Sequence, residues 1–272
     1  MWEIRLAGPK GLGVFAKNFI PRGTRIFSEK PLLAILQGQD TSALYNATKQ
    51  LSPDDRASLL SLSAHVTKES SFIRWNKASW YIMKETISDL NAKLRGRKKG
   101  TGNWRMPRFH AIGEHAAILS IFRSNAFKFG RTSQFHQAVF PRISRINHSC
   151  IPNAQGNFHE VLGKFNIHAT RDIDVDEELT LNYLQEHGAL RAARQLQLLN
   201  DYGFSCDCSA CDVVRGQEGE GKRTEMLDVL RAFAEGAANE DIQNPGEELR
   251  TMQLFINLLE GEGIAGREVA TM

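Results

Sequence analysis

The pattern of hydrophobic and polar positions changes several times along the chain. In residues 1–36, short apolar stretches alternate with polar residues between glycine and proline turns, which predicts strands. From about residue 41 the apolar spacing becomes helical. Ser52, followed by Pro53 and two aspartates, predicts the first turn of a helix. A longer helix is expected over residues 75–94.

The second half of the chain returns to strand-like patterns and then becomes helical again. We expect a helix over 111–122 and strands over about 135–184, with a hairpin in residues 157–167. An amphipathic helix is predicted over 185–201 and is closed by Tyr202 and Gly203. Residues 217–221 are interpreted as a flexible polar hinge, and the helices that follow are expected over 224–235 and 244–261.

Composition excludes several classes of protein. The chain has 272 residues, of which 42% are hydrophobic and 24% charged, so disordered, collagen-like and coiled-coil proteins do not fit. No apolar stretch approaches the roughly 18 residues of a membrane span, and the first residues lack the apolar core of a signal peptide. A net charge of +3 gives no support for a dedicated nucleic-acid-binding protein. We therefore expect an intracellular protein.

One short segment is strongly basic. Residues 95–100 have the sequence Arg-Gly-Arg-Lys-Lys-Gly. Such a segment could be a nuclear localisation signal or a phosphate contact. Its shortness favours a solvated connector.

The chain contains four cysteines, and three of them fall within six residues as C-x-C-x-x-C. Thiolates at this spacing can bind one metal ion from a tight turn, and the fourth cysteine would complete a tetrahedral zinc site. A disulfide, a redox pair and free thiols are the alternatives. A zinc deaminase does not fit, because Asp207 stands where that motif needs proline and His159-Glu160 has no spacer. We therefore predict a structural zinc site at Cys150, Cys206, Cys208 and Cys211.

A polar segment, Arg145–Asn153, runs Arg-Ile-Asn-His-Ser-Cys-Ile-Pro-Asn. Taken alone, His148 near Cys150 could be a base beside a thiol nucleophile. A polar turn whose side chains are satisfied internally explains the segment equally well. The expected use of Cys150 as a zinc ligand argues against the nucleophile.

Four segments together resemble the SET-domain protein lysine methyltransferases. They occur in the family's order, and they are the glycine loop and following hairpin, the Arg-x-Asn-His-Ser-Cys-x-Pro-Asn motif, the Glu-Glu-Leu-x-x-x-Tyr motif and the post-SET cysteine loop, at residues 11–26, 145–153, 177–183 and 202–211. The cysteine loop is similar to that of the SET-and-MYND type. Four cysteines cannot also build a MYND finger, so we expect that module to be absent. Asp176 departs from the usual glycine, although aspartate tolerates the left-handed conformation.

The resemblance implies an α+β protein with a mostly-β SET fold, in which the Asn-His-Ser segment threads beneath a loop as a pseudoknot. The implied organisation is a SET core, a helical insert, a connecting helix with the post-SET zinc loop, and a C-terminal helical segment, at residues 1–36 with 111–184, 37–110, 185–215 and 216–272.

The resemblance also implies transfer of methyl groups from S-adenosylmethionine to the side-chain amine of lysine in a histone or non-histone protein. Tyr183 would be the catalytic residue, and we expect it to orient the reacting groups rather than to abstract a proton. One structural zinc ion would be held by the four cysteines. The implied cofactor-binding residues are Lys10, Gly11, Leu12, Gly13, Asn125, Asn147, His148, Tyr183 and Phe204.

Other interpretations remain open at this point. Asn125 could simply end a helix, and Tyr183 without its motif would be a surface aromatic at a strand end. A catalytically silent SET module that binds partners or chromatin is the alternative function, and a zinc-dependent DNA-binding protein is less consistent with the low charge. We expect a monomer that acts on a protein substrate in the nucleus or cytoplasm, without membrane association or direct nucleic-acid binding.

Overall fold

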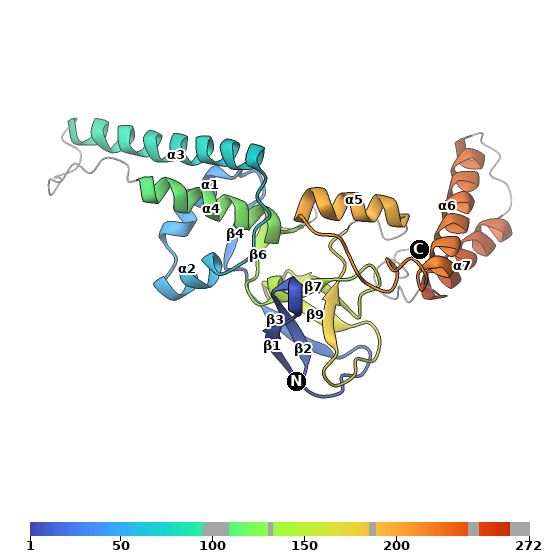
Figure 1. Ribbon diagram of the computed structural model, residues 1–272. Helices are drawn as coiled ribbons and strands as arrows, with labels where there is room; N and C mark the ends of the chain where they lie inside the picture. The colour runs from blue at the N-terminus through green and yellow to red at the C-terminus, as the bar shows by residue number, and fades with distance from the viewer. Residues whose placement is uncertain (95–108, 130–132, 185–188, 239–244, 262–272) are drawn as a thin grey trace. The chain divides into compact units, whose positions relative to one another are not determined.

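A computed structural model describes residues 1–94, 109–129, 133–184, 189–238 and 245–261 (Figure 1). The chain forms two compact units. The first combines Met1–Glu29, Arg145–His159 and Lys164–Met272, and the second combines Lys30–Ser144 with Glu160–Gly163. The basic segment 95–100 lies outside the described residues. None of the helices in the described ranges has the length and hydrophobicity that crossing a bilayer requires.

The first unit is built on two small sheets. One has the strand order β1-β2-β10-β7, formed by Trp2–Leu6, Leu12–Ala16, Glu178–Leu181 and Asn147–His148. The other has the order β3-β9-β8, formed by Arg25–Glu29, Lys164–Ala169 and Ala154–His159. Most neighbours are antiparallel, but β10 and β7 run parallel. This pairing sets the Asn-His segment beside β10, while its threading beneath a loop stays a prediction.

Two local predictions for the first unit are confirmed. The hairpin of β8 and β9 turns through Gly163, whose positive φ of 57° suits glycine. Asp176 adopts a positive φ of 64°, so the turn before β10 survives the missing glycine. Arg5 supports this turn, because its guanidinium donates to the Asp176 carboxylate at 2.8 Å and to the Asp176 carbonyl at 3.2 Å.

The helices of the first unit correct two sequence predictions. The helix expected over 185–201 is α5, Arg191–Tyr202, because the backbone of Leu190 is extended and starts the helix later. Gly203 ends it in the left-handed conformation, as expected. The predicted hinge over 217–221 is wrong, since α6 spans Gln217–Ala238 without a break. The ion pair of Glu218 with Lys222 (2.8 Å) and acidic residues in the first turn stabilise this start. The last helix, α7, is Pro245–Gly261.

The second unit is mainly helical. It contains α1 (Ser42–Lys49), α2 (Pro53–Leu60), α3 (Lys68–Leu94), α4 (Phe109–Asn125) and the sheet β4-β6-β5, formed by Leu33–Leu36, Phe135–Val139 and Phe127–Lys128. The predicted cap is confirmed, because the Ser52 hydroxyl accepts from the Asp55 amide at 3.1 Å. Helix α3 lies along α4 and begins before the expected residue 75 (Figure 1). Their shared core includes Leu44, Leu59, Ala78, Ile82, Ile118, Phe122 and Val139.

Residues 30–36 and 111–144, expected in the SET core, pack in this second unit with the helices of the insert. The predicted boundary between core and insert therefore stays a prediction. The two C-terminal helices α6 and α7 contact each other and belong to the first unit.

Candidate functional site

The glycine loop lies between β1 and β2 and is shaped by backbone conformations that favour glycine. Gly8 and Gly11 have φ values of 62° and 81°, and the Ala7 amide closes the loop on the Gly11 carbonyl at 2.7 Å. Gly13 has no room for a side chain, because a Cβ there would lie 2.6 Å from Glu178 Oε1 and 2.9 Å from Ala7 Cβ. The sequence around Gly13 thus brings backbone, rather than side chain, against β10.

Asn147 and Glu178 tie three of the predicted motifs together. The Asn147 side-chain amide donates to Glu178 Oε1 at 2.7 Å and to the Leu12 carbonyl at 3.2 Å. Lys10 Nζ lies 3.5 Å from Glu178 Oε2 and 3.3 Å from Asp207 Oδ1, which adds the cysteine loop to the group. Partial burial lowers the pKa of Lys10, but the two carboxylates outweigh it and raise the pKa above its usual value.

Asn153, the last residue of the Arg-x-Asn-His-Ser-Cys-x-Pro-Asn motif, has a structural role. Its buried side chain accepts from the Thr180 amide at 2.8 Å and donates to the Glu178 carbonyl at 2.8 Å. It also donates to Glu177 Oε1 at 2.9 Å. The asparagine therefore holds β10 against the motif, which accounts for the polar pattern without a catalytic role.

Tyr183 follows β10 directly and is held at both ends. Its hydroxyl donates to the Ile146 carbonyl at 2.6 Å, and its backbone amide donates to His148 Nδ1 at 3.1 Å. Its ring centroid lies 5.0 Å from that of Tyr202 and 6.5 Å from that of Phe204. Burial, with smaller contributions from Tyr202 and Glu178, raises the pKa of the Tyr183 hydroxyl above its usual value. Tyr183 is therefore a neutral hydrogen-bond donor rather than a base at neutral pH.

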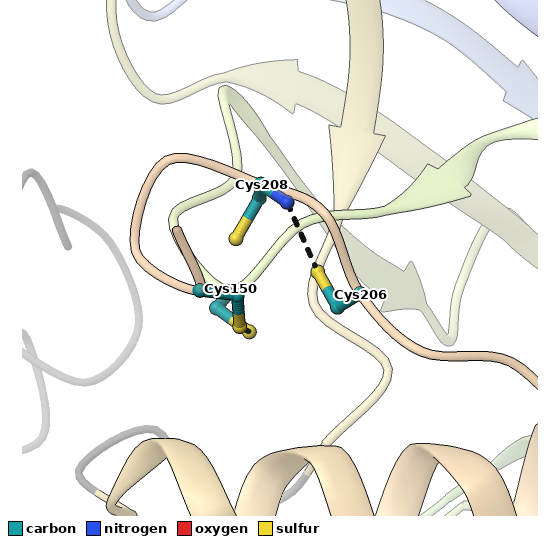
Figure 2. Close-up of side chains that lie close together, drawn as sticks. Cys150, Cys206 and Cys208 are labelled. Carbon is teal, nitrogen blue, oxygen red and sulfur yellow. Dashed lines mark hydrogen bonds between the residues drawn. The ribbon is translucent and has the colours of Figure 1, made fainter. Parts of the chain in front are cut away.

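The structure brings all four cysteines together. Their sulfur atoms lie within 4.8 Å of one another, and the Cys150 and Cys211 sulfurs are 3.5 Å apart. The side chains of Cys150, Cys206 and Cys208 gather around one space, and the Cys208 amide donates to Cys206 Sγ at 3.5 Å (Figure 2). A tetrahedral zinc ion with Zn–S bonds of about 2.3 Å has sulfurs about 3.8 Å apart. The donor type, number and spacing thus fit one zinc ion, and none of the cysteines is in a disulfide.

Helix α5 supports the cysteine cluster with two side chains that the sequence predictions did not identify. Arg194, only 1% exposed, donates from Nη2 to the Ala210 carbonyl at 3.0 Å and lies 3.8 Å from Cys211 Sγ. Gln195 forms a reciprocal pair with the backbone of Cys206, at 2.7 and 2.9 Å. The buried positions of Arg194 and Leu198, four residues apart, were the available signal that this helix face meets the cysteine loop.

Asn125 is the one predicted cofactor residue that lies in the second unit. It ends α4, and its side-chain amide donates to the Ser63 carbonyl at 2.7 Å and the Ile121 carbonyl at 2.8 Å. These bonds are those of a helix end. Its role in cofactor binding stays a prediction.

Residues of the first unit fit the cofactor that the motifs imply. The space at Gly13 that a Cβ would fill is bordered by Glu178 and Asn147, and open backbone at such a point allows a ligand to approach closely. The aromatic ring of Phe204 is half-buried beside Tyr202, which leaves part of it accessible for stacking. Lys10 to Gly13, Asn147 and Phe204 would therefore hold S-adenosylmethionine.

Comparison with known proteins identifies the class. Residues 11–184 match the family model of the SET domain, and the chain therefore belongs to the SET-domain family. It is 27% identical over 267 residues to the histone-lysine N-methyltransferase set5 of Schizosaccharomyces pombe, which covers 95% of this chain and 65% of that protein. It is 41% identical over 73 residues to the histone-lysine N-methyltransferase SMYD3 of Homo sapiens, which covers 27% of this chain and 16% of that protein.

The predicted resemblance to the SET-domain family is thereby confirmed, and members of the SMYD family are among the relatives. Among solved structures, the SET domain of LSMT bound to lysine and AdoHcy has a TM-score of 0.47 and 14% identity, covering 97% of this chain and 69% of that one. The chain spans less than two thirds of the length of either curated relative described above.

Proposed function

We propose that the protein transfers methyl groups from S-adenosylmethionine to the side-chain amine of lysine in a protein substrate. The observation that carries the proposal is the meeting of the glycine loop, the Asn-His segment, β10 and the cysteine loop around Asn147, Glu178 and Tyr183. Membership of the SET-domain family and relatives named histone-lysine N-methyltransferases support it. Histone lysines are the first acceptors to test, and non-histone lysines are the second.

The reaction needs a neutral amine at the end of the lysine. A solvated lysine has a pKa near 10.4, so freeing its amine at pH 7 costs about 4.6 kcal/mol. An apolar channel reduces that cost, because desolvation disfavours the charged ammonium. The rings of Tyr183, Tyr202 and Phe204 supply such an environment. The cofactor, when bound, supplies an electrophilic methyl carbon.

Tyr183 orients the reactants in this proposal. Its hydroxyl carries a proton at neutral pH, so it acts through position and dipole rather than by taking the amine's proton. The hydrogen bond to the Ile146 carbonyl aims its oxygen, and the bond from its amide to His148 holds its backbone.

Transfer of a labelled methyl group from S-adenosylmethionine tests the proposal, with core histones and a whole-cell lysate as separate acceptors. Tyr183→Phe should lower turnover roughly 10²-fold, as expected for lost positioning, while the Kd for the cofactor changes little. Tyr45→Phe is the matched control, because it removes a tyrosine hydroxyl from the second unit, where that group donates to Glu85 at 2.7 Å. Cofactor binding without transfer to either acceptor would favour the silent module, and unchanged turnover in Tyr183→Phe would remove that residue from the mechanism.

The proposed site of action is the nucleus or the cytoplasm, in line with relatives named for histone methylation. The monomeric state and the lack of direct nucleic-acid binding stay predictions.

A further inference from the structure

His148 has a second face that the cofactor role does not use. The residue is 5% exposed, and its imidazole lies between the cysteine cluster and Tyr183. Nδ1 accepts the Tyr183 backbone N–H at 3.1 Å, and Nε2 lies 3.4 Å from Cys150 Sγ. Its ring centroid is 5.3 Å from that of Tyr183. One side chain thus contacts both a candidate metal ligand and the candidate catalytic residue.

The two contacts define which ring nitrogen carries hydrogen. A nitrogen that accepts a backbone N–H cannot itself be protonated, so the neutral ring must carry its hydrogen on Nε2. Nε2 is then a donor, and the sulfur of Cys150 is the acceptor. His148 therefore cannot remove a proton from the Cys150 thiol, which excludes the base-and-nucleophile pair considered for these residues.

The same segment also holds the other end of Tyr183. The Tyr183 hydroxyl donates to the Ile146 carbonyl, two residues before His148, and Cys150 follows two residues after it. A metal bound to Cys150 would immobilise one end of this five-residue segment. Because residues 146 and 148 contact the two ends of Tyr183, the position of the segment decides the position of the tyrosine.

We propose that His148 is a positioning residue that couples the zinc centre to the catalytic tyrosine. Its Nε2–H bond to the Cys150 thiolate supports the metal site, and its Nδ1 holds the Tyr183 backbone where the hydroxyl faces the reacting groups. The inference rests on the proposed function for its catalytic half only. Outer hydrogen bonds to metal ligands commonly change metal affinity 10- to 100-fold.

Two substitutions separate the two bonds. His148→Asn places an amide oxygen near the position of Nδ1 and keeps an acceptor for the Tyr183 amide, but removes the donor to sulfur. His148→Gln places an amide nitrogen near the position of Nε2 and keeps that donor, but removes the acceptor. His159→Asn, an exposed histidine on β8 of the same unit, is the control.

With zinc saturating, His148→Gln should lower kcat about 10-fold or more, with little change in the KM for the cofactor, while zinc retention against a chelator stays near wild type. His148→Asn should show the reverse, with zinc lost at about 10-fold lower chelator concentration and kcat close to wild type. His159→Asn should change neither quantity. Equal effects of the two His148 variants on both quantities would overturn the coupling.

A measurement on the wild-type protein covers the case in which a variant does not fold. Long-range ¹H–¹⁵N spectra of the zinc-loaded protein should show the Nε2–H form of His148, and an Nδ1–H or doubly protonated ring would overturn the proposal. This spectrum and the chelator titration require no turnover. A failure of methyl transfer would therefore be distinguishable from a failure of the His148–Cys150 bond.

Discussion

The two compact units treat a buried histidine in opposite ways. In the first unit, both ring nitrogens of His148 have partners, a backbone amide and a cysteine sulfur. In the second, His115 is 3% exposed, and neither ring nitrogen has a hydrogen-bond partner among the described residues. Its neighbours are aromatic, with the rings of Tyr45 and Tyr81 at 4.9 and 6.0 Å. The first unit builds a polar site into its interior, whereas the second buries its histidine as an apolar side chain.

The cost of burial follows this difference. Burial lowers the pKa of His115 to about 4, with a smaller contribution from Lys49. In the first unit, the pKa of Arg194 is raised although its burial opposes this, because the cysteines of the cluster lie next to it. A buried polar group is therefore stabilising where partners surround it and a liability where they do not.

Loss of a zinc ligand should have the largest effect on this contrast. Cys150→Ser removes the fully buried thiol that joins the Asn-His segment to the cysteine loop. The variant should lose bound zinc and about 4–5 kcal/mol of stability, because a structural metal contributes directly to folding. Metal content and thermal unfolding measure both effects. Ser209→Ala, an exposed change in the same loop, is the control, and full metal content in Cys150→Ser would remove Cys150 from the site.

Acid should destabilise the second unit through His115. Below the unfolded pKa of about 6.5, the unfolded chain binds a proton that the folded chain accepts only near pH 4, so stability falls as the pH drops between these values. The loss for a shift of this size is up to about 3 kcal/mol. His115→Phe should flatten this part of the profile of unfolding free energy against pH, measured by urea denaturation. An identical slope in the two proteins would show that His115 is not the source.

Two glycines offer the smallest and most direct comparison. Gly13→Ala should cost about 1–3 kcal/mol and weaken cofactor binding, because its Cβ would overlap Glu178 and Ala7. Gly113→Ala, in α4 of the second unit, should instead stabilise by about 1 kcal/mol, since a Cβ there meets nothing within 4 Å and alanine favours the helix. Denaturant midpoints of both variants measure the pair. A stabilising Gly13→Ala would show that the loop can move away from β10.

Local chemistry was predictable wherever neighbours in the sequence decide it. The Ser52 cap, the Gly163 turn, the Gly203 helix end and the tolerated Asp176 each depend on a few adjacent residues. The hinge at residues 217–221 was wrong for a related reason, because its two glycines suggested flexibility while the charges of the first turn and the ion pair stabilise a helix.

The sequence by itself determined the motif residues of the candidate site, since cysteine spacing and the four ordered segments are properties of the chain. Tertiary structure alone decided which groups meet them: Glu178 against Gly13, Arg194 and Gln195 on the cysteine loop, and His148 between Cys150 and Tyr183. These contacts join residues from separate strands, helices and loops, and no local spacing encodes which side of a short strand or helix faces the other. Tertiary packing likewise decided that His115 is buried without a partner, because its helix position alone allows either a polar or an aromatic environment.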